Sequence, residues 1–84
     1  MNKESVVAAT LKELEYATVM YPKFNSAHEG YSVLNEEVFE LWEHVRAKQG
    51  YRNVNSMRSE AIQVAAMALR FAIDICCNEE AGQK

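Results

Sequence analysis

The chain contains little of the two residues that interrupt regular secondary structure, with one proline and three glycines among 84 residues. Pro22 and Gly50 fall between segments of helical periodicity, and Gly30 is a weak point inside one of them. No stretch shows the strict apolar–polar alternation of a half-buried strand. This scarcity predicts long helices separated by short links, and therefore an all-α fold.

Cysteine, positive charge and long apolar runs are also scarce. The two neighbouring cysteines, Cys76 and Cys77, make neither a disulfide framework nor a zinc site, and we interpret them as reduced thiols. Nine basic against twelve acidic residues give a net charge of −3, which disfavours nucleic-acid binding. No run approaches the ~18 apolar residues of a membrane span, and the N-terminus lacks a signal core. We therefore expect a cytoplasmic protein with no nucleic-acid or membrane partner.

Apolar residues, in contrast, are abundant for so short a chain, at 49%. A chain of this length buries only about 60% of the surface that it exposes when unfolded. We expect a single domain over residues 1–84 with a flexible tail from about residue 79. The apolar excess predicts a homo-oligomer.

Apolar residues at three- and four-residue steps predict a first and a second helix. The first runs from Glu4 to Tyr21 and ends there because proline, at Pro22, disfavours the helical conformation of the residue before it. The second runs from Ala27 to Lys48 and opens with a capping box, in which Ser26 and Glu29 satisfy each other's backbone N–H groups.

A third helix is predicted from Ser56, as its N-cap, to Cys77 or Asn78. Its middle, Ala61 to Ile73, is apolar nearly all round, which is typical of a helix buried on several sides. Two other helices cannot cover it fully in a chain of this length. We therefore expect the second and third helices to pack antiparallel and to join subunits into a dimer or tetramer.

Four glutamates lie close together on the second helix, at Glu36, Glu37, Glu40 and Glu43. Like charges three or four residues apart destabilise a helix by a few tenths of a kcal/mol per pair. Such a row is either a solvated face or a cation site. Glu37 and Glu40 border the apolar stripe rather than oppose it, which favours the cation site for these two. Glu36 and Glu43 point further toward solvent.

The third helix carries Glu60 and Gln63 on one face, and antiparallel packing would bring them level with Glu37 and Glu40. Three carboxylates and one amide form an all-oxygen site, which suits Mg²⁺ or Mn²⁺. Magnesium retains several waters and so leaves room for substrate phosphates.

Three other residues have both a structural and a functional interpretation. His28 is either a residue of the helix start or a substrate contact, and Trp42 either belongs to the core or stacks on a base. Arg70 either pairs with Asp74 at helical spacing or reaches a phosphate. The sequence contains no GxSxG, phosphate-binding glycine loop or HExxH motif, so a side-chain nucleophile is not expected.

Three segments, Phe24–Tyr31, Glu36–Trp42 and Glu60–Phe71, resemble the small phage and bacterial MazG-like proteins. These proteins belong to the all-α nucleoside triphosphate pyrophosphohydrolase superfamily. In that superfamily, an EExxE motif on one helix and an ExxD motif on the next supply the metal ligands. The resemblance spans about residues 10–75.

The resemblance implies Mg²⁺-dependent hydrolysis of a nucleotide between its α and β phosphates, giving a monophosphate and pyrophosphate. Glu37 and Glu40 match the first motif, with Glu36 as its leading member and the candidate general base for an attacking water. Glu60 matches the start of the second motif, and Gln63 occupies the place of its aspartate. Since this amide removes one negative charge, the alternative is a non-catalytic helical module that binds a nucleotide or a protein partner.

Overall fold

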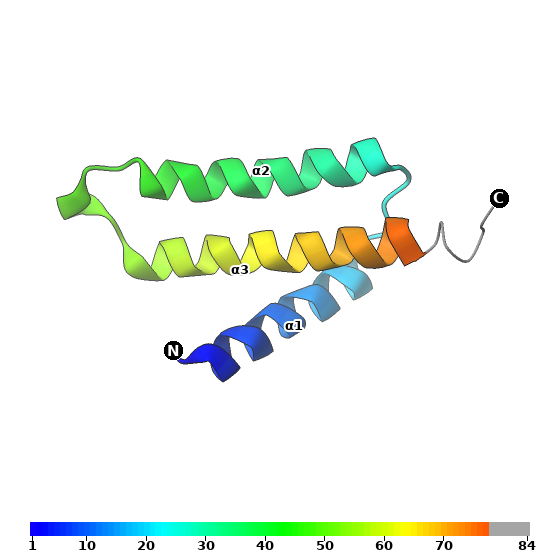
Figure 1. Ribbon diagram of the computed structural model, residues 1–84, viewed down its shortest axis with the longest axis horizontal. Helices are drawn as coiled ribbons and strands as arrows, with labels where there is room; N and C mark the ends of the chain where they lie inside the picture. Colours follow the sequence, from blue (N-terminus) through cyan, green and yellow to red (C-terminus); the bar gives the residue numbers. More distant parts are fainter. Residues whose placement is uncertain (78–84) are drawn as a thin grey trace.

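The computed structural model describes residues 1–77, and its regular elements in that range are all helical (Figure 1). The three α-helices are α1 (Lys3–Met20), α2 (Ala27–Val45) and α3 (Val54–Phe71). A short 3₁₀ turn, η1 (Gln49–Tyr51), precedes α3, and a π-helical segment, η2 (Ala72–Cys77), continues it. The prediction of an all-α chain with three helices is confirmed for this range.

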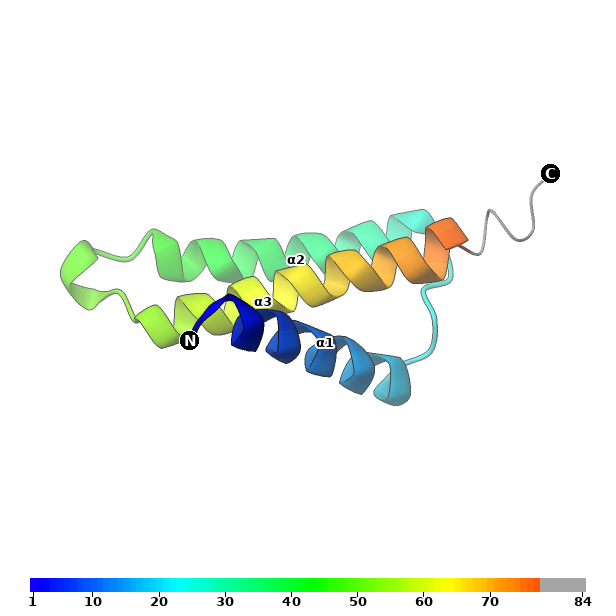
Figure 2. The same ribbon diagram turned by 60° about the horizontal axis from the view of Figure 1, so that its bottom comes forward.

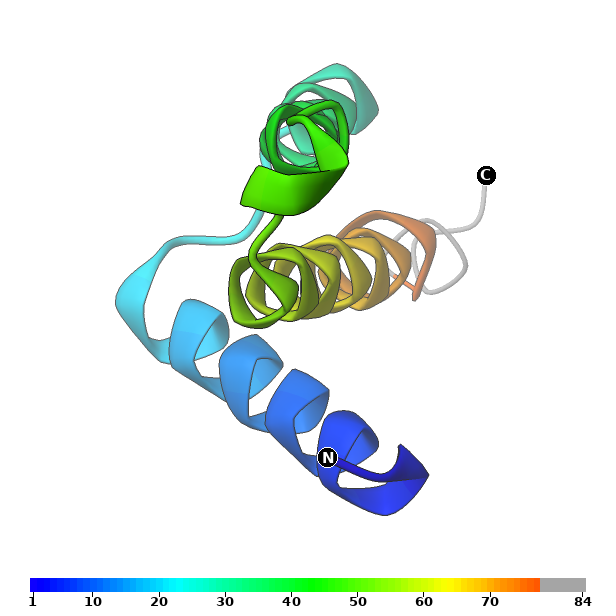
Figure 3. The same cartoon turned by 90° about the vertical axis from the view of Figure 1, so that its left-hand side faces the viewer.

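The third helix is the central element of the arrangement, because it contacts both α1 and α2. Figures 1 and 2 show α2 and α3 side by side and running in opposite directions, as the sequence predicts. Helix α1 crosses α3 obliquely, which the end-on view of Figure 3 makes clear. None of the helices within residues 1–77 is both long enough and apolar enough to cross a membrane.

Local hydrogen bonds and the proline set the two ends of α1. At its start, the Asn2 side chain accepts a hydrogen bond from the backbone N–H of Ser5 at 2.8 Å, and the Ser5 hydroxyl accepts one from the N–H of Asn2. At its end, Tyr21 has an extended backbone directly before Pro22. The restriction that proline imposes on its predecessor therefore ends this helix one residue earlier than predicted.

Helix α2 begins where predicted but ends earlier. The Ser26 hydroxyl accepts from the N–H of Glu29 at 3.1 Å, whereas the Glu29 carboxylate accepts from the N–H of Asn25 and not from that of Ser26. The reciprocal half of the predicted capping box is therefore wrong. The helix ends at Val45 rather than at residue 48, and Arg52 Nε donates to the Val45 carbonyl at 2.9 Å, satisfying a group that the helix end leaves free.

The start of α3 also differs from the prediction. Its N-cap is Asn53, whose side chain accepts from the N–H of Ser56 at 3.0 Å. Ser56 is thus the third residue of the helix rather than its cap, because an asparagine three residues earlier caps at least as well as serine. Beyond Phe71 the chain stays helical but widens into η2. Residue 78 and the predicted tail from residue 79 lie outside the described residues.

The apolar core is small and lies where α1, the link before α2 and α3 meet. Its buried members are Ala17, Phe24, Ala66 and Met67, and within residues 1–77 no large side chain is fully buried. Half-buried apolar side chains from all three helices and from η2 surround them. The packing accordingly depends on a few close contacts and on one buried ion pair.

This ion pair joins α3 to η2 and to the link between α1 and α2. Arg70 is only 6% exposed and lies 3.5 Å from the carboxylate of Asp74, which is 8% exposed. The guanidinium also donates to the carbonyl of Pro22 and stacks over the ring of Phe24 at 4.2 Å. The Asp74 carboxylate accepts from the N–H of Phe24 at 3.2 Å. The predicted pairing of Arg70 with Asp74 is therefore confirmed.

Gly30 allows α2 to approach the aromatic residues of the core closely. It is buried, and a Cβ atom placed on it would lie 2.7 Å from the ring of Phe71 and 3.1 Å from the ring of Phe24. The absence of a side chain therefore has a packing reason. The glycine predicted as a weak point within the helix is thus also a point of close contact with the core.

We expect Gly30→Ala to destabilise the protein. Alanine improves helix propensity by about 1 kcal/mol, but forcing a methyl group against two rings costs about 1–3 kcal/mol. The net loss in the free energy of unfolding should be about 1 kcal/mol, measured by urea denaturation. Gly50→Ala is the matched control, because a Cβ atom placed on Gly50 would have nothing within 4 Å. A Gly30→Ala variant more stable than wild type would contradict the proposed close packing.

Candidate metal centre

Three glutamates from two helices converge near the middle of the α2–α3 pair. Glu37 and Glu40 of α2 and Glu60 of α3 each place a carboxylate oxygen within 4.8 Å of the others. Glu40 is exposed, whereas Glu37 and Glu60 are half-buried. The structure thus brings together the three carboxylates that the sequence predicts as metal ligands, and their role as ligands stays a prediction.

The electrostatics of this group are unfavourable without a cation. Burial, followed by repulsion from Glu40 and Glu60, raises the pKa of Glu37 above its ordinary range. The negative charge of the neighbouring Glu36 adds a smaller contribution in the same direction. A raised carboxylate pKa in a cluster of like charges is a recognised property of functional sites.

A histidine also lies close to Glu60. The Nε2 atom of His44, near the end of α2, is 3.7 Å from a Glu60 carboxylate oxygen. This contact is an ion pair only when His44 is protonated. Sequence reasoning did not single out His44 as part of a site, although its position four residues after Glu40 places both on one helix face.

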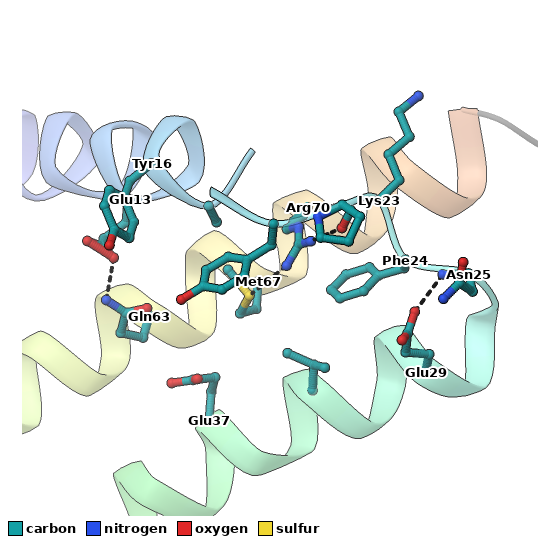
Figure 4. A pocket seen from close by; sticks show the side chains of 14 residues that line it. Glu13, Tyr16, Lys23, Phe24, Asn25, Glu29, Glu37, Gln63, Met67 and Arg70 are labelled. Atoms are coloured by element: carbon teal, nitrogen blue, oxygen red, sulfur yellow. Dashed lines mark hydrogen bonds between the residues drawn. The ribbon is translucent and has the colours of Figure 1, made fainter. Parts of the chain in front are cut away.

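A cavity of about 540 Å³ adjoins the group, and Glu37 lines it (Figure 4). Its volume falls within the range of pockets that bind small molecules. Part of its wall is aromatic, from Tyr16, Tyr21 and Phe24. The side chain of Lys23 also borders it. The cavity therefore combines apolar surface with a carboxylate shared with the glutamate group.

Gln63 lines this cavity as well, but its amide is engaged by a residue that sequence reasoning missed. Gln63 Nε2 donates a hydrogen bond to the carboxylate of Glu13, on α1 (Figure 4). Glu13 is half-buried and lies between Thr10 and Ala17, the two buried residues of α1. A charged residue on the apolar face of a predicted helix was the signal that would have identified it.

The remaining predicted site residues have different positions. Arg70 lines the cavity, although its guanidinium is already paired with Asp74. Glu36 and His28 are exposed, and neither belongs to the carboxylate group or to the cavity wall. Trp42 is 52% exposed and does not line the cavity either. Its interpretation as a core residue is therefore wrong. Around the helix axis, Trp42 lies well away from Glu37, on a side of α2 that stays exposed.

Comparisons with known proteins give no family assignment, since no family model, curated protein or solved structure matches the chain. The fold and the acidic cluster therefore define it as a small three-helix protein with an exposed acidic group. Any more specific assignment depends on the chemistry of the residues.

The donor set fits a divalent cation. Three carboxylates provide only oxygen atoms, which Mg²⁺ and Mn²⁺ prefer, and the repulsion that raises the pKa of Glu37 is what a bound cation would relieve. The exposure of Glu40 leaves one side of the group open to solvent, so that a ligand can approach.

Because the pKa of Glu37 is raised, the difference in stability between wild type and Glu37→Gln should depend on pH. A carboxyl group whose pKa is higher in the folded than in the unfolded protein costs stability when ionised, and the cost disappears as the pH falls through the folded pKa. We therefore expect the metal-free Glu37→Gln variant to melt at a higher temperature than wild type at about pH 7, with little difference near pH 4.

Thermal melts in the presence of a chelator measure this difference. Glu15→Gln removes an exposed charge from α1 and serves as the control, for which we expect no pH-dependent change. A gain for Glu37→Gln of equal size at both pH values would contradict the electrostatic origin of the effect.

Proposed function

We propose that the protein is a divalent-metal-dependent nucleotide pyrophosphohydrolase of the MazG-like kind, which hydrolyses a nucleoside triphosphate to a monophosphate and pyrophosphate. The observation that carries this proposal is the convergence of Glu37, Glu40 and Glu60 beside a cavity that Glu37 also lines. The resemblance of the sequence to MazG-like proteins, with its EExxE segment on α2, supports the same conclusion.

In this proposal, separate residues bind the cation, activate the water and accept the nucleoside. Glu37, Glu40 and Glu60 hold the cation, which when bound supplies Lewis-acid stabilisation of the charge that develops on the phosphate oxygens. Glu36 is exposed next to Glu37 and is the candidate base that takes a proton from the attacking water. The cavity accepts the nucleoside, with Tyr16 among the aromatic side chains that offer a face for stacking.

Positive charge near the cavity would orient the phosphates or the sugar. Lys23 lines the cavity, is exposed and makes no ion pair among residues 1–77. Arg70 contributes mainly through its structural pairing with Asp74, because a guanidinium held by a carboxylate and a carbonyl has few donors left. His28 and Trp42 contribute less to our proposal than the sequence suggests, since neither lines the cavity.

The second candidate function is a non-catalytic module that binds a nucleotide or a protein partner. The observation that favours it is Gln63, a neutral amide where the resemblance implies an aspartate, whose N–H₂ group is already bound by Glu13. A site with one fewer charged ligand binds a cation more weakly. Binding without turnover is the result that distinguishes this alternative.

The two candidates are separated by measuring metal binding and turnover together. A cation at 100 times its Kd stabilises a folded protein by about 2.7 kcal/mol. We expect millimolar Mg²⁺ or Mn²⁺ to raise the melting temperature of wild type, and we expect pyrophosphate release from a panel of nucleoside triphosphates. Glu37→Gln/Glu40→Gln should abolish both effects.

Glu15→Gln is again the control, because it removes an exposed charge that belongs neither to the carboxylate group nor to the cavity wall. A metal-dependent melting shift without pyrophosphate release would favour the non-catalytic module. The absence of any shift in wild type, or an equal shift in the double variant, would refute the metal site.

We also propose that two copies of the chain associate through a surface that we term the back face. By helical position it lies on the side of α2 and α3 away from Glu37 and Glu40. It consists of exposed residues without charge, namely Tyr31, Val38, Trp42, Ala61, Ala65, Ala68 and Leu69. Its large side chains are 40–63% exposed.

The exposed apolar side chains of the back face and the small core support this proposal. A half-exposed large side chain presents on the order of 100 Å², so the four large side chains of the back face would supply about half of the roughly 800 Å² per partner that a stable interface buries. The alanines would let two copies of α3 approach closely. Because only four apolar residues are buried among residues 1–77, covering such a surface would add substantially to the stability of the fold.

Light scattering after size-exclusion chromatography tests this association. We expect wild type at micromolar concentration to have at least twice the monomer mass, and Leu69→Glu to shift it to monomer because it places a charge on the back face. Val19→Glu, at a 77% exposed position of α1, should leave the mass unchanged. A wild-type monomer at tens of micromolar protein would contradict the proposal.

A further inference from the structure

The amide of Gln63 and the carboxylate of Glu13 form a hydrogen-bonded pair that joins α3 to α1 in the cavity wall (Figure 4). Both side chains are half-buried. Within residues 1–77, Glu13 makes no ion pair, and the Gln63 amide is its hydrogen-bond donor. A partly buried carboxylate needs such a donor, because desolvation of an unpartnered charge is costly.

The pair also leaves the oxygen of the amide outside the hydrogen bond. A side-chain amide carries a donor nitrogen and an acceptor oxygen that point in different directions. Glu13 accepts from the nitrogen, and Gln63 shares the cavity wall with Glu37 and, three residues after Glu60, the same face of α3. An amide oxygen is a suitable ligand for Mg²⁺ or Mn²⁺, whereas an amide N–H₂ group would repel a cation.

We propose that Glu13 is a positioning residue, which holds the Gln63 amide so that its oxygen is available to a cation at the Glu37–Glu40–Glu60 group. This inference rests on the metal site proposed above. A carboxylate that accepts from the amide N–H also polarises the amide, so its oxygen becomes a better ligand. The negative charge that an aspartate at position 63 would carry is thereby supplied by Glu13 of α1, which would act on the cation through the Gln63 amide.

The pair explains why residue 63 is neutral. An aspartate or glutamate at this position would face Glu13 with a second carboxylate and no donor between them. Glutamine at 63 and glutamate at 13 are therefore mutually dependent. Exchanging the two residue types reverses donor and acceptor but preserves the hydrogen bond. If either residue acted alone, this exchange would not restore what the single substitutions lose.

The experiment is Mn²⁺ titration by calorimetry on wild type, Glu13→Gln, the double variant Glu13→Gln/Gln63→Glu, Glu37→Gln and the control Glu15→Gln. We expect Glu13→Gln to weaken Mn²⁺ binding by about tenfold and the control to bind like wild type. The double variant should bind at least as tightly as wild type, because its acidic ligand at 63 is again held by a donor from α1.

Two metal-free measurements accompany the titration. Gln63→Glu alone should lower the melting temperature by placing two carboxylates together, and adding Glu13→Gln should restore it. In ¹H–¹⁵N spectra, the Gln63 side-chain N–H₂ resonances should shift in Glu13→Gln but not in Glu15→Gln.

The outcomes separate this inference from the proposed function. If Glu37→Gln loses Mn²⁺ binding but Glu13→Gln binds like wild type, the metal site stands and the role of Glu13 is refuted. If wild type does not bind Mn²⁺, the metal site itself is refuted, and with it any positioning role. If both variants weaken binding and the double variant recovers the loss caused by Glu13→Gln, both proposals are supported.

Discussion

A buried guanidinium sets the position of the link between α1 and α2. Arg70 has little solvent around it and therefore needs negative charge and acceptors from the protein. Asp74 supplies the charge, the carbonyl of Pro22 accepts a hydrogen bond, and the ring of Phe24 provides a face for the cation. The link is thereby fixed against α3, and it forms one end of the cavity. The cavity wall thus depends on an ion pair rather than on an extensive apolar core.

Charge is distributed unevenly along the site that this link closes. The cations Lys23 and Arg70 border the cavity at the link, whereas the three carboxylates of the acidic group lie further along α2 and α3. The protein thus keeps Glu37 partly buried beside two like charges, which costs stability in the absence of a cation. Local arrangements that lower stability concentrate at functional sites, and this cost is a physical reason to regard the group as more than a solvated face.

Periodicity and breaker residues predicted the three helices, because helix formation and helix ends depend largely on local sequence. The predicted antiparallel pairing of α2 with α3 also agrees with the structure, since the short link between them makes the chain reverse direction. Combined with this pairing, the same periodicity predicted that Glu37, Glu40 and Glu60 lie at the same height along the α2–α3 pair. It did not predict the end of α2, which involves a side chain from beyond the helix, Arg52. Nor did it identify Glu13, because the crossing of α1 over α3 joins residues 50 positions apart. Nor did it predict the π-helical widening at η2.

The site is assembled from two different helix contacts. Helices α2 and α3 carry all three carboxylates of the acidic group, whereas α1 reaches the site through the cavity wall, at Glu13, Tyr16 and Ala17. A displacement of α1 relative to α3 would therefore reshape the cavity and break the hydrogen bond between Glu13 and Gln63, while the three carboxylates would stay together on the other two helices. The shape of the cavity and the spacing of the acidic group thus depend on different helix contacts.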